Sequence, residues 1–267
     1  MAIASLPMYA LPGLLEATDE WWAGLARAFI AEGLQDVPTS LSDGDMRAYW
    51  GAPDLLFGQT CGYPLTHDYA GRLRVVATPA YAAEGCTGSN YSSAILVRTD
   101  GSATSLREMK GRRAVINAHD SQSGFSALRH AVAPLAGGDN FFADVQVSGG
   151  HRASMLAVAE ARADIAAVDC VTFALFQRLE PELTGALRVL AFSAGAPALP
   201  YVTAAGSSDD QVARMRAGLQ RACADPGLAE VRDALLIAGT EVLPDGAYDR
   251  IMDMETEAMG LGYPEVR

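Results

Sequence analysis

Two serines and a glycine stand where a strand is expected to give way to a helix. Ser121, Ser123 and Gly124 follow an apolar segment that ends near Ala118, and the helical pattern begins near Ser123. The first N–H groups of a helix have no partner inside it, and the helix dipole makes that end partly positive. Serine hydroxyls add donors, and a glycine lets a ligand oxygen come close to the backbone. With Gln122 between the serines, this loop predicts a site for a phosphate or carboxylate group.

An ordinary helix cap is the alternative for these serines. A serine just before a helix commonly accepts a hydrogen bond from a backbone N–H of the first turn. A single serine at this place would be interpreted as such a cap. The run Ser-x-Ser-Gly over residues 121–124, directly after a buried strand, favours the anion site.

A second loop of similar make-up lies further along the chain. Gly149 and Gly150 precede another expected helix, and His151 stands in its first turn. A histidine there can donate a ring N–H to an oxyanion, and can carry charge if the anion raises its pKa. A structural histidine bonded to a backbone carbonyl is the alternative. The spacing fits a crossover to a neighbouring strand, which would bring the two loops together.

A third loop follows another strand. Gln59 and Thr60 end that strand and Gly62 allows a sharp turn, so an amide and a hydroxyl could reach a ligand from the opposite side. Cys61 could be a nucleophile, because a helix start lowers the pKa of a thiol. His67 keeps that option open, but the sequence pairs no base with Cys61. A buried small side chain is the favoured interpretation of Cys61.

Strand-like and helix-like segments alternate along the whole chain. The clearest strand-like segments cover residues 3–9, 54–60, 112–118, 143–150 and 164–170. Helical periodicity lies between several of them, and Trp21 and Trp22 are expected in the core. Such alternation predicts an α/β fold with mostly parallel sheets. Ligands in these folds lie at the carboxyl ends of strands, which is where all three loops occur.

The composition excludes several classes of partner. The 267 residues include 32 acidic and 20 basic side chains, for a net charge of −12. Broad binding to nucleic acid or to an anionic membrane needs clustered positive charge and is not expected. No apolar run approaches the roughly 20 residues that span a bilayer, so no direct membrane insertion is expected. The start, MAIASLPMYALPG, has no secretory pattern; the chain is expected to be cytoplasmic, or a mature form whose leader was removed.

The cysteines do not form a metal-binding motif. Cys61, Cys86, Cys170 and Cys223 are widely spaced, with no C-x-x-C pair and no partnering histidine motif, so no zinc site is expected. No other metal and no cofactor is expected in this chain. Buried free thiols are the favoured interpretation. Two disulfides in an oxidising compartment remain the alternative, because spacing alone cannot decide.

Several segments together carry a pattern known from one protein family. In chain order they read DLLFGQTCGYPL, SNYSSAILV, HDSQSGF, SGGHRASMLAVAEARADIAAVDC and PALPYVT, with LPDGAYDRIMDM near the end. Their order and spacing resemble the phosphate, phosphite and phosphonate substrate-binding proteins of ABC transporters. These are the PhnD-like group of type 2 periplasmic binding proteins. The resemblance covers nearly the whole chain.

The resemblance implies a two-lobed Venus-flytrap fold, in which each lobe is a mostly parallel sheet flanked by helices. Residues 1–94 and 197–267 would form the first lobe, and residues 95–196 the second. Two crossing strands, near Ser93–Val97 and Leu190–Ala194, would form the hinge.

The resemblance also implies a ligand site in the cleft between the lobes. The anion would lie on Ser121, Gln122, Ser123, Gly124 and His151. Tyr91, Gln59 and Thr60 would face it, and Asp169, at the end of a further strand, would accept from a protonated ligand oxygen or an amine. Members that bind aminophosphonates carry carboxylates at positions that correspond to Val171 and Leu199, which this chain lacks.

The favoured function is the binding of a small oxyanion as the solute-binding component of an ABC-type uptake system. An ABC transporter permease would then be the partner, and the location would be periplasmic if an upstream leader has been removed. One alternative is a cytoplasmic enzyme of the same fold, a lyase or synthase; another is a ligand sensor for a larger metabolite. No acid, base and nucleophile are spaced to support catalysis, so an enzyme is disfavoured.

Overall fold

The computed structural model describes residues 2–267, which form two compact units. The first unit consists of residues 2–82 and Pro197–Ala247, and the second of Ala83–Ala196 and Tyr248–Arg267. The chain therefore passes from one unit to the other three times.

The first unit is built on a five-stranded sheet in the order β1-β2-β11-β3-β12. Its strands are β1 (Ile3–Ser5), β2 (Leu55–Gln59), β3 (Leu73–Tyr81), β11 (Tyr201–Ala204) and β12 (Ile237–Glu241). β1 and β2 are parallel, whereas β11 is antiparallel to β2 and β3, and β12 is antiparallel to β3. The sheet is mixed rather than mostly parallel, because β11 and β12 are both antiparallel to β3. These two strands come from the second segment of the unit, Pro197–Ala247.

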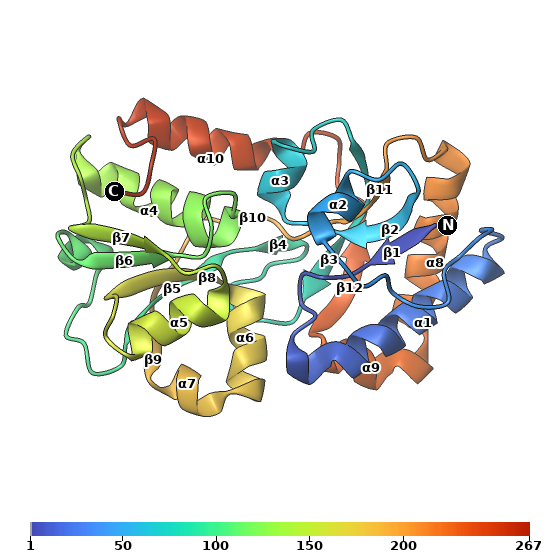
Figure 1. Ribbon diagram of the computed structural model, residues 1–267, viewed down its shortest axis with the longest axis horizontal. Helices are drawn as coiled ribbons and strands as arrows, with labels where there is room; N and C mark the ends of the chain where they lie inside the picture. Colours follow the sequence, from blue (N-terminus) through green and yellow to red (C-terminus); the bar gives the residue numbers. More distant parts are fainter. Residues whose placement is uncertain (1) are drawn as a thin grey trace. The chain divides into compact units, whose positions relative to one another are not determined.

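Helices cover this sheet and enclose an aromatic core. They are α1 (Leu15–Ala31), α2 (Met46–Trp50), α3 (Gly62–Thr66), α8 (Asp209–Ala224) and α9 (Ala229–Ala234), with short 3-10 turns at Pro12–Leu14 and Pro226–Leu228. Trp21 and Trp22 are each 1% exposed, as the periodicity predicts. α1 packs on α8 and α9 (Figure 1). Gly218 allows this approach, since a Cβ there would lie 2.5 Å from the Phe29 ring.

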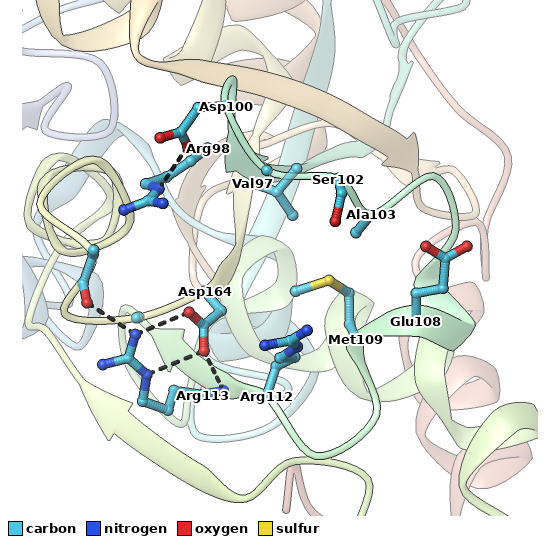
Figure 2. A pocket seen from close by; sticks show the side chains of 13 residues that line it. Val97, Arg98, Asp100, Ser102, Ala103, Glu108, Met109, Arg112, Arg113 and Asp164 are labelled. Atoms are coloured by element: carbon cyan, nitrogen blue, oxygen red, sulfur yellow. Dashed lines mark hydrogen bonds and ion pairs between the residues drawn. The ribbon is translucent and has the colours of Figure 1, made fainter.

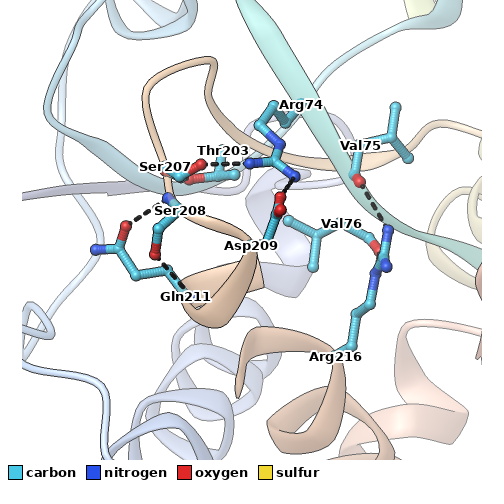
Figure 3. A network of polar contacts seen from close by, with 9 residues as sticks. All are labelled: Arg74, Val75, Val76, Thr203, Ser207, Ser208, Asp209, Gln211 and Arg216. Atoms are coloured by element: carbon cyan, nitrogen blue, oxygen red, sulfur yellow. Dashed lines mark hydrogen bonds and ion pairs between the residues drawn. The ribbon is translucent and has the colours of Figure 1, made fainter. Parts of the chain in front are cut away.

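Arginines connect α8 to β3 (Figure 3). Ser208 forms a capping box at the first turn of the helix. Arg74 of β3 pairs with Asp209 at 2.6 Å, and Arg216 donates to the carbonyl of Val76 at 2.8 Å. These bonds fix the helix against the sheet.

The second unit has its own five-stranded sheet, in the order β7-β6-β8-β5-β9. The strands are β5 (Ser93–Arg98), β6 (Arg113–Ile116), β7 (Asp144–Val147), β8 (Ile165–Asp169) and β9 (Leu187–Phe192). β6 is parallel to β7 and β8, while β5 is antiparallel to β8 and β9. A separate two-stranded sheet joins β4 (Asn90–Tyr91) and β10 (Ala196–Pro197).

Five α-helices accompany this second sheet. They are α4 (Ala127–Ala136), α5 (His151–Ala159), α6 (Cys170–Leu179), α7 (Pro181–Gly185) and α10 (Asp249–Gly260). A 3-10 turn, η2, covers Leu106–Met109, and a π-helical turn, η3 (Gln122–Ser126), leads directly into α4. Among the described residues of both units, no helix is long and apolar enough to cross a bilayer.

The C-terminal segment belongs to the second unit, not to the first as expected from the sequence. Ala258 and Tyr263 are both fully buried in the core of the second unit, and α10 runs beside α4 (Figure 1). Arg129 on α4 is only 2% exposed and pairs with Glu255 on α10 at 2.9 Å. A buried cation needs a partner, so this ion pair and the apolar contacts hold the segment here.

The boundary before β5 also differs from the expected one. Residues 83–94, expected in the first lobe, lie in the second unit. The strands expected to form a hinge, β5 and β9, are hydrogen-bonded neighbours inside the sheet of the second unit.

Candidate functional site

The loops after β6 and β7 meet at the carboxyl ends of these two strands. β6 and β7 are parallel, with Ile116 opposite Val147, so both loops leave the sheet on the same side. The N–H of Ser148 donates to the carbonyl of Ile116 at 2.9 Å, and that of Gly149 to the carbonyl of Asn117 at 3.0 Å. The predicted crossover to a neighbouring strand is therefore confirmed.

Ser121 is a helix cap. Its Oγ accepts a hydrogen bond from the N–H of Gly124 at 3.0 Å, so the cap interpretation holds for this serine. The hydroxyl hydrogen of Ser121 is not used in that bond and can still donate. Ser121 is 6% exposed and lies at the N-terminal end of a continuous helical stretch formed by η3 and α4.

Ser123 and His151 form the contact that joins the two loops. Ser123 Oγ and His151 Nε2 are 2.9 Å apart, and Ser123 is 4% exposed. His151 is the first residue of α5, whose N-cap, Gly150, supplies no side-chain cap. The N-terminal ends of two helical stretches thus contribute to one small region, where both helix dipoles favour negative charge.

The His151 imidazole is neutral at pH 7. Burial disfavours the charged ring and lowers the pKa of His151 to about 4. Its Nδ1 is buried and has no hydrogen-bond partner among residues 2–267. A neutral imidazole carries one N–H and one lone pair, so the ring can donate one hydrogen bond and accept another.

Gly124 is required by close packing inside the loop. A Cβ at this position would lie 1.9 Å from Asn117 Oδ1 and 3.3 Å from His151 Cε1. The first distance is far inside van der Waals contact, so any side chain would displace Asn117. The absence of a side chain at Gly124 therefore allows Asn117 and His151 to pack close to the backbone of this loop.

Asn117 is a residue that the sequence analysis did not select. Its Oδ1 is buried without a hydrogen-bond partner in the part of the chain that the structure describes, and the same holds for Gln122 Oε1. The other side of the Gln122 amide, Nε2, contacts Met254 Sδ on α10 at 3.4 Å. Asn117 directly follows the last residue of β6, and this position at a strand end could have marked it as a candidate from the sequence.

Asp169 ends β8 and caps the next helix. Its Oδ1 accepts from the N–H groups of Val171 at 2.7 Å and Thr172 at 2.9 Å, and the residue is 2% exposed. This carboxylate therefore has a structural task at the start of α6. Tyr91, 3% exposed on β4, belongs to the same unit.

Gln59 and Thr60 belong to the first unit, at the end of β2. Gln59 Nε2 donates to Tyr81 Oη at 2.9 Å and to the carbonyl of Leu199 at 3.0 Å. Thr60 is fully buried, and its hydroxyl donates to the carbonyl of Cys61 at 3.2 Å. Both side-chain donors of the Gln59 amide are thus used inside this unit.

The loop that holds Cys61 has a local hydrogen-bond pattern of its own. Cys61 is partly buried at the N-cap position of α3. The His67 ring stacks on Tyr63 with the centroids 3.8 Å apart, and Nδ1 lies 2.9 Å from the carbonyl of Tyr63.

A cavity in the second unit lies away from these loops. It has a volume of about 430 Å³ and opens near the first residue of β6 rather than the last. Arg98, Arg112 and Arg113 line it together with Asp100, Glu108 and Asp164. Arg113 and Asp164 are 2.9 Å apart in an ion pair (Figure 2). Because positive and negative side chains balance here, this cavity lacks the excess of donors that an anion needs.

Comparison with known proteins identifies the family. Residues 49–248 match the family model described as "ABC transporter, phosphonate, periplasmic substrate-binding protein". The chain belongs to this family. That result confirms the resemblance found in the segments quoted from the sequence. No protein of curated function matches the sequence.

Solved structures confirm the two-lobed periplasmic-binding-protein fold. A binding protein component of an ABC phosphonate transporter from Pseudomonas aeruginosa is 17% identical, with 97% of this chain and 87% of that chain covered and a TM-score of 0.74. PhnD1 from Prochlorococcus marinus, in complex with methylphosphonate, is 12% identical, with 96% and 97% covered and a TM-score of 0.73. XAC2383 from Xanthomonas citri, bound to ATP, is 14% identical, with 97% of each chain covered and a TM-score of 0.71.

Proposed function

We propose that this chain binds a small phosphorus oxyanion, a phosphonate in the first place, through the loops after β6 and β7. The observation that carries the proposal is the pairing of Ser123 with a neutral His151 where two helical stretches begin. The family supports a phosphonate as the class of ligand.

The proposed site binds by neutral donors rather than by cations. Arg152, the residue after His151, is bonded to Glu180 at 2.7 Å. Backbone N–H groups, serine hydroxyls and the imidazole would then supply the hydrogen bonds. Such donors favour an oxyanion that carries modest charge, and their value increases when water is excluded.

Acceptors in the site point to a ligand that also carries a hydroxyl. Asn117 Oδ1 and Gln122 Oε1 are buried and lack partners among the described residues, and a buried acceptor without a partner is costly. A phosphonate that keeps one P–OH group would satisfy one of them. This supports a singly protonated phosphonate over a fully ionised one.

The chain is not suited to a phosphonate with a positively charged amine. Val171 is fully buried in the first turn of α6, and Leu199 is 5% exposed. Neither side chain offers a counter-charge for an amine, whereas the resemblance implies carboxylates at these two positions in relatives that bind aminophosphonates. We therefore expect methylphosphonate to bind more tightly than 2-aminoethylphosphonate.

The proposed role is delivery of this ligand to an ABC transporter permease in the periplasm. Membership of a periplasmic substrate-binding family supports this role over a lyase, a synthase or a sensor. The engagement of Asp169 as a helix cap also speaks against its use as a catalytic base.

Calorimetric titration tests the proposal directly. The purified chain would be titrated with methylphosphonate, phosphite, phosphate, 2-aminoethylphosphonate and acetate at one pH and salt concentration. We expect binding of at least one phosphorus oxyanion and none of acetate. Binding of acetate alone, or of none of these compounds, would contradict the proposed ligand class.

A further inference from the structure

Two cysteines far apart in the sequence meet in the second unit. The sulfur atoms of Cys86 and Cys170 are 3.5 Å apart, although 84 positions separate the residues along the chain. The other two cysteines, Cys61 and Cys223, belong to the first unit. We propose that Cys86 and Cys170 are an oxidisable pair that closes to a disulfide and connects residues 83–91 to the start of α6.

The backbone around both cysteines is already held in place. Ser92 Oγ donates to the carbonyl of Gly85 at 2.8 Å, and the N–H of Cys170 donates to the carbonyl of Ser92 at 3.1 Å. The N–H of Cys86 donates to the carbonyl of Ala83 at 3.1 Å. Ser92 therefore connects the two cysteine-bearing segments whether or not the sulfur atoms are bonded.

Only a small movement separates the thiols from a disulfide. An S–S bond is about 2.05 Å long, so each sulfur would have to move by roughly 0.7 Å. Rotation of the two side chains about their Cα–Cβ bonds can supply that distance. The proposal therefore requires only a small movement of the two sulfur atoms.

The turn before Cys86 is built for this close approach. Gly85 has a φ of +93°, which L side chains rarely adopt. A Cβ there would also lie 2.7 Å from the Phe192 ring and 2.8 Å from Ser92 Oγ. A glycine is thus needed to bring Cys86 to this place, next to β5 and β9.

The two thiols differ in acidity, which sets the order of reaction. The hydrogen bond between them lowers the pKa of Cys86 and raises that of Cys170. Burial and the Asp169 carboxylate act on both thiols to raise the pKa. Cys86 is also the more exposed of the two, since Cys170 is 2% exposed. Cys86 therefore ionises and meets an oxidant first.

A small-molecule disulfide, written RSSR, is the oxidant. The Cys86 thiolate attacks one of its sulfur atoms, which forms a mixed disulfide and releases one thiolate, RS⁻. Cys170 then loses its proton and attacks the Cys86 sulfur, which forms the Cys86–Cys170 bond and releases the second RS⁻. The two protein thiols lose two protons and two electrons, and RSSR becomes two RSH.

Closure would stabilise the second unit. A cross-link across a long loop restricts the unfolded chain, and such bonds are typically worth enough to raise the melting temperature by roughly 5–15 °C in a protein of this size. The oxidising conditions of the periplasm, the compartment of this family, would keep the bond formed.

The test treats the reduced protein with oxidised glutathione and counts the remaining thiols after denaturation. The chain has four cysteines, and we expect two to remain reactive. The mass should fall by that of two hydrogens, and a non-reducing peptide map should join the peptides of Cys86 and Cys170. The melting temperature should rise, and a reductant should reverse all of these changes.

Matched variants separate this pair from the other thiols. Cys86→Ser should prevent the loss of two hydrogens and the rise in melting temperature, while Cys61→Ser combined with Cys223→Ser should leave both intact. The peptide map of the unaltered protein gives the answer even if a Cys170 variant fails to fold. Four thiols after oxidation, a glutathione that stays attached to Cys86, or a bond to a different cysteine would overturn the proposal. None of these readouts depends on ligand binding.

Discussion

The two units use the residues at their strand ends in different ways. In the first unit the Gln59 amide is bonded to Tyr81 and Leu199, so its donors are satisfied within the unit. In the second unit Asn117, Gln122 and His151 each keep a buried polar atom without a partner among the described residues. Buried polar groups are normally paired, so a set of unpaired atoms in neighbouring loops is consistent with a site that a ligand completes. The contrast supports the proposal that the second unit recognises the ligand.

The largest expected effect comes from removing both members of the Ser123–His151 pair. Hydrogen bonds to a charged ligand are worth about 1.5–3 kcal/mol each, so Ser123→Ala with His151→Ala should weaken oxyanion binding by about 3–6 kcal/mol, which is about 100-fold or more. Calorimetric titration with methylphosphonate would measure this loss.

A matched pair of substitutions away from the loops serves as the control. Ser102 is exposed, and His130 pairs with Glu257 near the surface of α10. The variant with Ser102→Ala and His130→Ala should keep the affinity of the original protein. Equal affinities for both double variants would remove the second unit from its proposed role.

The pH dependence of stability should come next in size. The pKa of His151 is about 4 in the folded chain, and about 6.5 is usual for an unfolded one. The unfolded chain therefore binds the proton first, so stability is full above pH 6.5 and falls as the pH drops towards 4, by at most about 3 kcal/mol. Urea unfolding across this range would measure it.

The variant His151→Asn isolates this effect. It removes the ionisable ring, so the part of the pH dependence between about 6.5 and 4 that belongs to His151 should disappear. Carboxylates that titrate at the lower end of the range remain in both proteins and cancel in the comparison. Identical profiles for the two proteins would show that His151 is not buried as a neutral ring.

Gly124→Ala should cost less overall but should affect both folding and binding. The new Cβ would be 1.9 Å from Asn117 Oδ1, and overpacking of this kind costs about 1–3 kcal/mol. The displaced Asn117 should also weaken the binding of methylphosphonate. Gly185→Ala is the control, because a Cβ there meets nothing within 4 Å. Unchanged stability and affinity in Gly124→Ala would contradict the packing described for the loop.

Gln59→Leu should give the smallest effect and tests the other side of the comparison. Loss of the two donated bonds leaves the Leu199 carbonyl and Tyr81 with one partner fewer, at a cost of about 1–2 kcal/mol in the free energy of unfolding. Affinity should change little, since the side-chain donors are used within the unit. A large loss of affinity with unchanged stability would instead support the expectation that Gln59 contacts the ligand.

Local patterns in the sequence were enough for several parts of this protein. The alternation of apolar strands and amphipathic helices predicted an α/β fold, and the periodicity around Trp21 and Trp22 predicted the core of the first unit. The serines at 121 and 123 and the glycines before His151 predicted two helix starts. These features depend on residues within a few positions of one another, which is the range over which backbone geometry and capping act.

Contacts between distant segments were decided only by the tertiary structure. The Ser123–His151 bond needs β6 and β7 to be neighbours, and the meeting of Cys86 with Cys170 needs β5 to lie beside β8. The buried Arg129–Glu255 pair holds the C-terminal helix in the second unit, although its sequence position suggested the first. The antiparallel pairs β11–β3 and β5–β8 were also decided by the tertiary structure, because they depend on the order in which the chain returns to each sheet. Strand order and long-range pairing leave no periodic trace in the sequence, because they depend on which surfaces fit together after the local elements have formed.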